Sequence, residues 1–266
     1  MTQRFITAII GAAVLVFCVY WNEWTYFAVF FFICLISQLE FYKLVGLDGM
    51  VPLKYWGTLS GLSLFTISFL IENQILDNKF YYLIFPIVTG IFFIKLYKKS
   101  DKKPFTNIAF TFIGIIYIAL PFTLLNIITF SRGGYSQELI IGLLLILWAS
   151  DTGAYFAGIK FGKRKLFERV SPKKSWEGSI GGAALALAMA YFLSYYFRTI
   201  VLEQWLIISG IIVVGGTYGD LVESLFKRSI EIKDSGTKLP GHGGFLDRID
   251  SLLLASPFLV FYLKVF

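Results

Sequence analysis

The stretch ELIIGLLLILWASDTGAYFAG, residues 138–158, begins with Glu138 and carries a single further charge, Asp151. A helix needs about 20 mainly apolar residues to cross a hydrocarbon core about 30 Å thick. The stretch is therefore predicted to be a transmembrane helix. Because a charged side chain inside such a helix is costly and usually functional, Asp151 is also a candidate site residue.

Comparable apolar runs follow one another along the 266 residues and predict an all-α, polytopic integral membrane protein with about nine transmembrane helices. The runs are 5–20, 25–42, 55–71, 80–97, 105–130, 138–158, 178–197, 202–226 and 249–266. Pro121 in the fifth run, and Gly215, Gly216 and Gly219 in the eighth, predict local kinks or unwound turns. Gly181 and Gly182 predict close helix packing of the seventh run.

The composition supports a membrane protein. Hydrophobic residues make up 57% of the chain and charged residues only 15%, with a mean hydropathy of +0.72. Average soluble domains have about 45–50% apolar and about 25% charged residues. These values exclude a disordered chain, a nucleic-acid-binding arm and almost any soluble enzyme. Cys18 and Cys34 lie inside apolar runs and provide neither a disulfide framework nor a zinc-ligand spacing.

Lysine and arginine are distributed unevenly between the two predicted sides of the membrane. All but four of the 24 basic residues fall in the N-terminus or in the loops near 43–54, 95–104, 160–177 and 227–248. The four exceptions are Lys79, Arg132, Arg198 and Lys264. The positive-inside rule then places the N-terminus and the loops 160–177 and 227–248 in the cytoplasm, and the C-terminus outside.

Acidic residues gather at the cytoplasmic ends of the last helices. Asp220 is followed at i+3, i+4 and i+7 by Glu223, Ser224 and Lys227, which places all four on one helix face. Asp247 and Asp250, three residues apart, share a face at the start of the ninth run. The alternative is a set of buried salt bridges that tie the helices together. Glu40, near the end of the second run, is interpreted as an interfacial residue.

Several carboxylates beside basic residues indicate a divalent cation with a phosphate substrate. Mg²⁺ prefers oxygen ligands and is usually held by one or two carboxylates together with substrate phosphates. The predicted metal ligands are Asp220, Glu223, Asp247 and Asp250. A second cation beside Mg²⁺ is left open.

A glycine-rich, basic segment separates these acids. Glycines allow backbone amides to approach an anion closely, and such amide concavities bind phosphate. Positive side chains would supply the countercharge that phosphoryl transfer needs. The candidate residues of the segment are Lys227, Arg228, Lys233, Asp234, His242, Gly243, Gly244 and Arg248. His242, the only histidine, is expected to orient the loop or donate a hydrogen bond to a phosphate rather than to act as a general base.

The loop at 160–177 contains Lys173 and Lys174, which predict a lid over a polyphosphate or a lipid phosphate. Ser175 or Glu177 is expected to cap the helix that follows. The alternative is a basic loop that ends in a helix cap.

Together these residues resemble the phosphatidate cytidylyltransferases, also called CDP-diacylglycerol synthases. The resemblance covers about residues 147–251. It lies in the signature from Ser224 to Asp250, in Asp151-Thr152-Gly153-Ala154-Tyr155, and in Ser171-Pro172-Lys173-Lys174-Ser175 with Glu177-Gly178. The family often has threonine where this chain has Ser175, and the hydroxyl is kept. The first 140 residues resemble the family only in their number of hydrophobic spans.

The resemblance implies that CTP and phosphatidate give CDP-diacylglycerol and pyrophosphate with Mg²⁺, in phospholipid biosynthesis. It implies an enzyme of the inner membrane with its site facing the cytoplasm, and a homodimer. It also implies metal binding by Asp220 and Asp247, with Asp151, Asp234 and Asp250 as secondary candidates for involvement. Residues 1–130 would form the N-terminal transmembrane region and residues 131–266 the catalytic region.

Two other functions remain open at this point. A CTP-dependent polyprenol kinase would have a similar membrane architecture but would transfer the γ-phosphoryl group and release CDP. An ion-coupled transporter would also place acids within helices. However, the acids of this chain cluster at one surface, and no paired broken helices occur in two halves.

Overall fold

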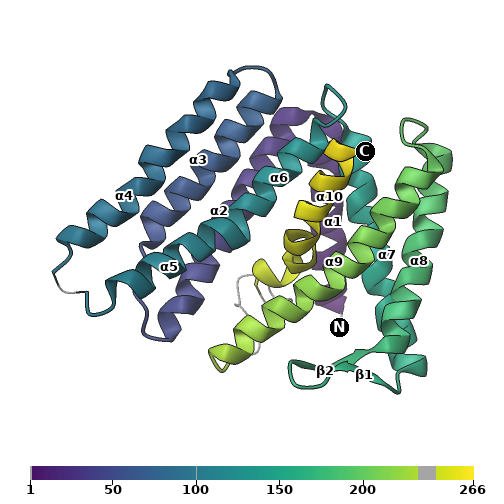
Figure 1. Cartoon of the computed structure of the whole chain (residues 1–266). Helices are drawn as coiled ribbons and strands as arrows, with labels where there is room; N and C mark the ends of the chain where they lie inside the picture. Colours follow the sequence, from purple (N-terminus) through teal and green to yellow (C-terminus); the bar gives the residue numbers. More distant parts are fainter. Residues whose placement is uncertain (1, 100, 233–243) are drawn as a thin grey trace. The chain divides into compact units, whose positions relative to one another are not determined.

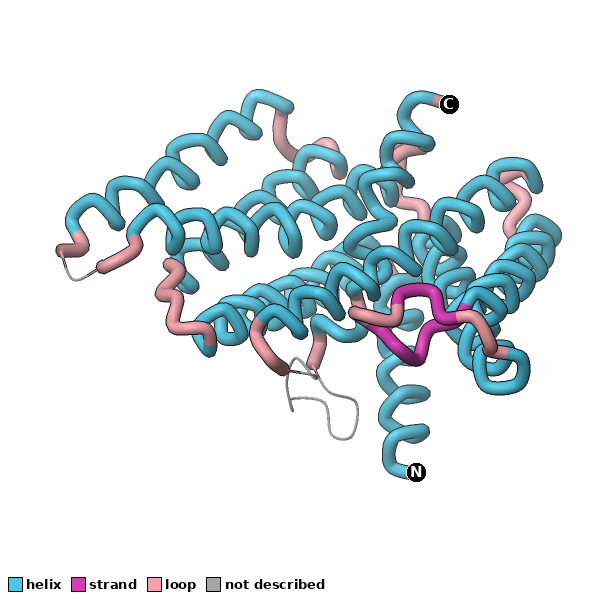
Figure 2. The backbone as a smooth tube through the Cα atoms, turned by 60° about the horizontal axis from the view of Figure 1, so that its bottom comes forward, coloured by secondary structure: helices cyan, strands magenta, loops and turns pink. Residues whose placement is uncertain are grey.

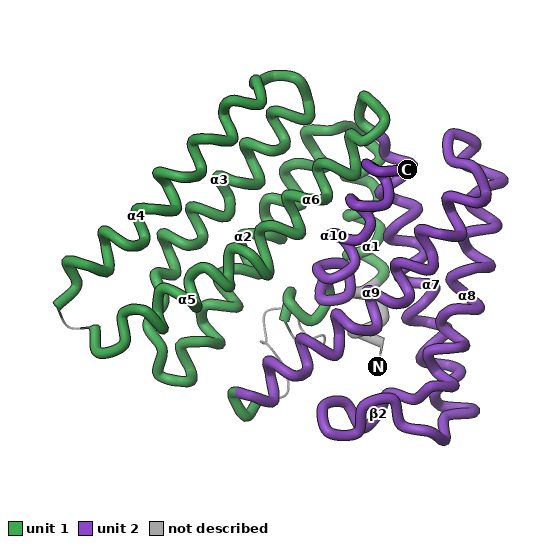
Figure 3. The backbone as a smooth tube through the Cα atoms, in the orientation of Figure 1, with its two compact units in different colours: residues 1–135, 230–248 green, residues 136–229, 249–266 purple. Residues whose placement is uncertain are grey.

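The computed structural model describes residues 2–99, 101–232 and 244–266 and consists almost entirely of helices (Figure 1). It divides into two compact units, residues 1–135 with 230–248, and residues 136–229 with 249–266 (Figure 3). Within the described residues, nine helical segments follow the nine predicted runs. Six of them are long and apolar enough to cross a membrane by length and composition. An all-α membrane protein is thus confirmed, while the count of nine crossings and the orientation of the termini stay predictions.

The first unit contains the helices of the N-terminal half of the chain. They are α1 (Thr2–Trp21), α2 (Glu23–Leu47), α3 (Lys54–Glu72), η1 (Asn78–Leu83) with α4 (Ile84–Tyr97), and α5 (Pro104–Gly114), η2 (Ile115–Ala119) and α6 (Leu120–Thr129). Helix α3 contacts α2, α4 and α6. Phe65 and Phe69 of α3 are buried, and their rings pack against Phe27 of α2.

A capping box separates α1 from α2, which would otherwise read as one long apolar helix. The Asn22 side-chain oxygen accepts hydrogen bonds from the backbone N–H groups of Trp24 and Thr25, both at 2.9 Å. The Thr25 hydroxyl accepts one in return from the Asn22 N–H at 3.2 Å. These bonds satisfy amide groups that the first turn of a helix leaves without intrahelical partners.

The predicted irregularity at Pro121 is confirmed as a π-helical turn, η2, between α5 and α6. Proline has no N–H, so the helical hydrogen-bond pattern cannot continue unchanged across it. Two side chains of α2 bond to carbonyl groups just before the turn. Gln38 donates to the Gly114 carbonyl at 3.3 Å, and Tyr42 donates to the Thr111 carbonyl at 2.7 Å. The irregular backbone is therefore covered by protein, as a membrane requires.

The second unit contains α7 (Gln137–Phe161), strands β1 (Lys165–Phe167) and β2 (Ser171–Ser175), α8 (Trp176–Tyr196), α9 (Leu202–Ser229) and α10 (Asp250–Val265). The short 3-10 helix η3 (Leu246–Arg248) precedes α10 but belongs to the first unit. The prediction of an all-helical chain missed the antiparallel hairpin β1–β2, drawn in magenta in Figure 2. The hairpin pairs Lys165 with Ser175 and Phe167 with Ser171.

Helices α7 and α8 pack at backbone distance, as the small residues of α8 predicted. A Cβ atom added at Gly181 would lie 2.2 Å from the Ala157 Cβ, and one at Gly153 would lie 2.5 Å from the Gly181 carbonyl oxygen. Gly182 similarly faces the Ser150 carbonyl oxygen, at 2.8 Å from an added Cβ.

The unwound turn predicted at the glycines of α9 is absent, because α9 is helical from Leu202 to Ser229, while a kink there stays a prediction. Its glycines instead contact α10. An added Cβ at Gly215 would lie 2.8 Å from the Ala255 Cα, and one at Gly219 would lie 2.4 Å from the Asp250 carbonyl oxygen. The glycines therefore bring the two helices together and do not break one of them.

Candidate active site

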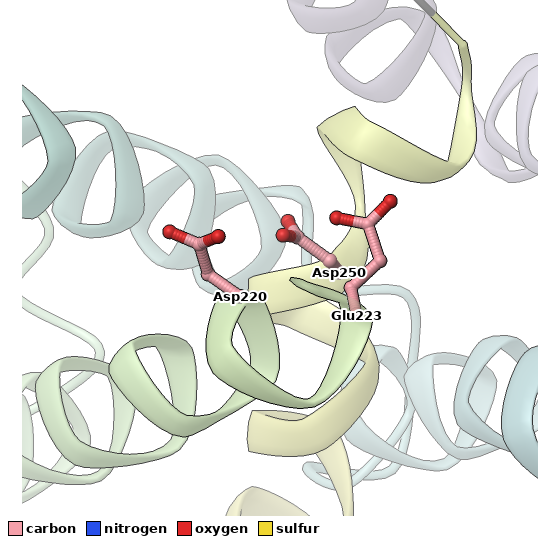
Figure 4. A group of neighbouring side chains, drawn as sticks. All are labelled: Asp220, Glu223 and Asp250. Carbon is pink, nitrogen blue, oxygen red and sulfur yellow. The ribbon is translucent and has the colours of Figure 1, made fainter. Parts of the chain in front are cut away.

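Three carboxylates meet where α9 lies against the start of α10, within the second unit. Asp220 and Glu223 come from successive turns of α9, and Asp250 is the first residue of α10. Each offers a carboxylate oxygen, and these three oxygens lie within 4.8 Å of one another. Figure 4 shows the Asp250 carboxylate between the other two. Glu223 and Asp250 are buried, at 1% and 7% exposure, whereas Asp220 is half-buried.

Two lysines balance part of this negative charge. The Lys174 ammonium at the end of β2 lies 2.6 Å from Asp220 Oδ2 and donates to the Thr217 carbonyl oxygen at 3.2 Å. The Lys227 ammonium lies 3.3 Å from Glu223 Oε2, one helical turn further along α9. The predicted shared face of Asp220, Glu223 and Lys227 is therefore present.

The hairpin that carries Lys174 is tied to the start of α8. Ser175 is the N-cap of α8 and accepts a hydrogen bond from the Gly178 N–H at 3.1 Å, as predicted. Glu177 does not cap the helix in this way. Its carboxylate accepts hydrogen bonds from the backbone N–H groups of Lys163 at 3.0 Å and Arg164 at 3.2 Å. Ser175 and Glu177 thus hold the base of the hairpin.

The second unit carries four more of the predicted residues, Asp151, Lys173, Ser224 and Arg228. Asp151 on α7 is exposed and close enough to Asp250 for their charges to repel each other. Lys173 and Arg228 are exposed, and Ser224 is half-buried.

Asp247 and Arg248 lie in η3 of the first unit. The Gly244 N–H donates to Asp247 Oδ2 at 3.1 Å, which closes a short turn before η3. This amide of the glycine-rich segment is therefore bonded to a carboxylate of the chain itself. The predicted residues Lys233, Asp234, His242 and Gly243 lie outside the described residues.

The structure adds contacts that the sequence did not reveal. The pairing of Lys174 with Asp220 depends on the missed hairpin, and no local pattern in residues 165–175 indicated it. Glu40, interpreted from the sequence as an interfacial residue, is buried within the protein, at 2% exposure, and accepts a hydrogen bond from the Phe245 N–H at 2.9 Å. The position of Glu40 near the end of an apolar run marked it in the sequence as unusual. Its hydrogen-bond partner, Phe245, could not be predicted from the sequence.

Comparison with known proteins identifies the kind of enzyme. The model of the cytidylyltransferase family matches residues 2–266, nearly the whole chain. The chain belongs to the cytidylyltransferase family. The family match also includes the first 140 residues, where the sequence motifs gave no specific resemblance. It confirms the predicted nucleotidyltransferase and favours cytidylyl transfer over a polyprenol kinase or a transporter.

Several curated relatives are named phosphatidate cytidylyltransferase. The relative from Bacillus subtilis is 33% identical over 275 residues, which cover 100% of this chain and 98% of the relative. The relative from Haemophilus influenzae is 40% identical over 168 residues, covering 61% of this chain and 58% of the relative. The relative from Pseudomonas aeruginosa is 50% identical over 124 residues, 46% of either chain.

Proposed function

We propose that the protein transfers the cytidylyl group of CTP to phosphatidate and so makes CDP-diacylglycerol and pyrophosphate for phospholipid biosynthesis. The observation that carries the proposal is the cluster of Asp220, Glu223 and Asp250, with Lys174 and Lys227 in contact with it. It occurs in a chain that the cytidylyltransferase family matches over nearly its full length. The name shared by the relatives supports phosphatidate as the acceptor.

In the proposed reaction, a phosphate oxygen of phosphatidate attacks the α-phosphorus of CTP in line with the bond to the leaving group. A new P–O bond forms to the lipid phosphate. The bond between the α-phosphorus and the bridging oxygen breaks, and its electron pair leaves with pyrophosphate. A phosphate monoester has a second pKa of about 6 and is mostly dianionic at neutral pH. The nucleophile therefore needs no general base, which agrees with a loop-orienting or hydrogen-bonding role for His242.

The carboxylate group fits Mg²⁺ by its chemistry. Mg²⁺ takes oxygen ligands, and three acidic side chains with oxygens within 4.8 Å of one another repel one another unless a cation offsets their charge. We propose that Asp220, Glu223 and Asp250 hold the ion, with Asp247 as a further ligand. Asp247 precedes Asp250 by three residues, so chain connectivity keeps their Cα atoms within about 11 Å. When bound, the ion would offset charge on the substrate phosphates at the entering and leaving oxygens.

The basic residues would then bind the phosphates of the substrates. We assign this role to Lys227, Arg228, Lys233 and Arg248, with Lys173 and Lys174 contributed by the hairpin. Gly243 and Gly244 would let the backbone approach an anion closely, while Asp151, Asp234 and Ser224 would line the site. Ser175 and Glu177 contribute by holding the hairpin that positions Lys174.

The proposal includes the setting of the site. Phosphatidate would enter from the bilayer and CTP from the cytosol, so the site would lie at headgroup level on the cytoplasmic side of the inner membrane. Residues 131–266 would carry most of the catalytic side chains and residues 1–130 would support them. We also propose that the enzyme works as a homodimer.

The deciding experiment uses detergent-purified protein with phosphatidate, Mg²⁺ and CTP labelled at the α-phosphate. We expect label to enter the lipid phase and pyrophosphate to be released in equal amount. The variant Asp220→Asn should lose at least about 99% of this activity, because it removes a charged ligand of the ion. The matched control Glu203→Gln, at the exposed start of α9, should be fully active.

Two outcomes would contradict the proposal. Release of CDP in the presence of a polyprenol, with no label in phosphatidate, would indicate a kinase. Absence of turnover with either lipid would favour an ion-transport role for the acid cluster.

A further inference from the structure

Glu40 is a buried acid on α2, far in sequence from every motif of the proposed site. It lies near the cytoplasmic end predicted for this helix and is 2% exposed. Its Oε2 atom accepts a hydrogen bond from the backbone N–H of Phe245 at 2.9 Å, across 205 positions of the chain. Both residues belong to the first unit, so this contact lies within one compact body.

Phe245 begins the short segment that presents two proposed site residues. On one side of it, the Gly244 N–H donates to Asp247 Oδ2. On the other side, the Arg248 N–H donates to the Phe245 carbonyl oxygen at 3.1 Å and closes η3. Leu246, between them, is fully buried. The bond from Phe245 to Glu40 connects this turn to a transmembrane helix of the N-terminal half.

Burial of a glutamate in an apolar helix costs free energy, so a glutamate at this position indicates a specific role. A buried amide N–H that loses its acceptor costs free energy, so a buried side-chain oxygen at hydrogen-bond distance fixes the position of the donor. The partner of Glu40 is a main-chain amide, so the bond orients the backbone at Phe245 whatever side chain stands there. Two residues later that backbone carries Asp247, and then Arg248.

We infer that Glu40 is a positioning residue for cytidylyl transfer, which holds the main chain at Phe245 and thereby sets the place of Asp247 and Arg248. The inference rests on the proposed function. It gives the N-terminal helices a defined part in the reaction, because one of their side chains orients the segment that delivers a metal ligand and a phosphate-binding cation.

The test compares three variants of the full-length protein in detergent. Glu40→Met removes the acceptor and keeps a similar length. Glu40→Gln keeps a side-chain oxygen that can accept from Phe245. Gln38→Met is the matched control, because Gln38 is another buried polar residue of α2, but it bonds to the Gly114 carbonyl instead. Hydrogen exchange of the amides in 244–248 is measured without metal, and kcat and the KM for CTP are measured with it.

In Glu40→Met, we expect exchange at the Phe245 amide to rise about tenfold or more, because protection from local opening is lost. We expect kcat to fall by about tenfold or more, since displacement of a catalytic group by about 1 Å can cost two orders of magnitude. Glu40→Gln should stay within about threefold of the parent in both, because its side-chain carbonyl oxygen can still accept the hydrogen bond from the Phe245 N–H. Gln38→Met should leave exchange at Phe245 unchanged.

The inference is overturned if Glu40→Met leaves exchange at Phe245 unchanged, or if exchange rises while kcat and KM stay at the parent values. If Glu40→Met does not fold, Glu40→Asp takes its place, because it withdraws the acceptor by one methylene and should give the same two losses. Failure of the proposed function is seen separately, as a lack of CDP-diacylglycerol from the parent protein, while the exchange measurement still decides whether Glu40 holds Phe245.

Discussion

At Asp250 the side chain that we propose as a metal ligand also opposes the stability of the metal-free protein. Its carboxylate is enclosed beside Asp220 and Glu223, and the charges of Asp220 and Asp151 repel it. Asn has nearly the same shape and no charge. We predict that Asp250→Asn raises the midpoint of thermal unfolding without metal by about 2–4 °C, which for a chain of this size corresponds to about 1 kcal/mol. The same variant should lose most of its activity.

Thermal unfolding with and without Mg²⁺ checks this prediction. The parent protein should be stabilised by Mg²⁺, and Asp250→Asn should lose most of that gain. Glu203→Gln, an exposed change on the same unit, should behave as the parent does. A lower midpoint for metal-free Asp250→Asn would show that the acid is a structural residue instead.

Lys174 contacts Asp220 directly, so its ammonium competes with a metal ion for that carboxylate. We predict that Lys174→Met lowers the dissociation constant for Mn²⁺, measured by electron paramagnetic resonance on the CTP-free protein, by about threefold or more, because a positive charge at short range is removed. Its kcat should fall, because a phosphate-binding cation is lost. The exposed neighbour Lys173 is the control, and Lys173→Met should change Mn²⁺ affinity much less. Equal affinities in the two variants would argue against the competition.

At the scale of the elements, the α7–α8 contact depends on the absence of side chains. Ala at Gly181 would bring its Cβ to 2.2 Å from the Ala157 Cβ, so the two helices would have to separate. We predict that Gly181→Ala destabilises the protein by about 1–3 kcal/mol, the usual cost of overpacking. Gly210→Ala is the matched control. It lies within α9 with no atom within 4 Å of an added Cβ, and should be neutral or slightly stabilising. Thermal unfolding of both variants distinguishes packing from helix propensity.

A second element-scale contact joins α4, α5 and the segment before α3. Lys95 donates to the Val51 carbonyl oxygen at 2.7 Å and to the Asp101 carboxylate, which also accepts from the Asn107 side chain at 2.7 Å. The hydrogen bond from Lys95, followed by those from the Lys103 amide and Asn107, lowers the pKa of Asp101 below its ordinary value of 3.8.

Because the pKa of Asp101 is lower in the folded protein, the charged carboxylate stabilises the fold above the ordinary pKa. This stabilisation is lost as the pH falls through the lowered value. We predict that Asp101→Asn reduces the unfolding midpoint at pH 7, and that the difference from the parent shrinks steadily below about pH 4. Unfolding curves of the two proteins from pH 7 to pH 2.5 provide the measurement. A difference that does not depend on pH would assign the effect to lost packing.

The helices were predictable because their information is local. The length and hydropathy of each apolar run are properties of that run alone, so the nine runs correctly predicted nine helical segments. Ser175 and Pro121 likewise marked a helix cap and an irregular turn. The contacts of Lys174 and Glu40 were not predictable, because each joins residues far apart in sequence. The hairpin is local, but its strands Lys165–Phe167 and Ser171–Ser175 are too short and too polar to show the alternation of apolar residues that marks a strand. The glycines of α9 show the same limit. A glycine pair in a sequence can mark either a weakened helix or a close contact with a neighbouring helix. The sequence does not show where α10 packs, and that packing decides between the two.

For the whole molecule, the distribution of basic residues makes a prediction about orientation. We predict that cysteines placed at Lys102 and Lys165, in a chain without Cys18 and Cys34, react with a membrane-impermeant maleimide only in inverted vesicles. A cysteine at Thr199 or Lys264 should react in intact cells, because both positions are predicted to lie on the opposite side. Labelling of Thr199 and Lys102 from the same side would overturn the predicted topology.

The contact between Gly219 and the Asp250 carbonyl oxygen has a consequence for ion size. Gly219 directly precedes Asp220, so the main chains beside two of the three acids touch without an intervening side chain. This contact limits how far the backbones of Asp220 and Asp250 can shift within the coordination cage that we propose. Mg²⁺ binds oxygen at about 2.0–2.1 Å, whereas Ca²⁺ needs about 2.3–2.6 Å. A cage of this construction resists expansion, and we expect calcium to act as a competitive inhibitor that occupies the carboxylates without supporting turnover.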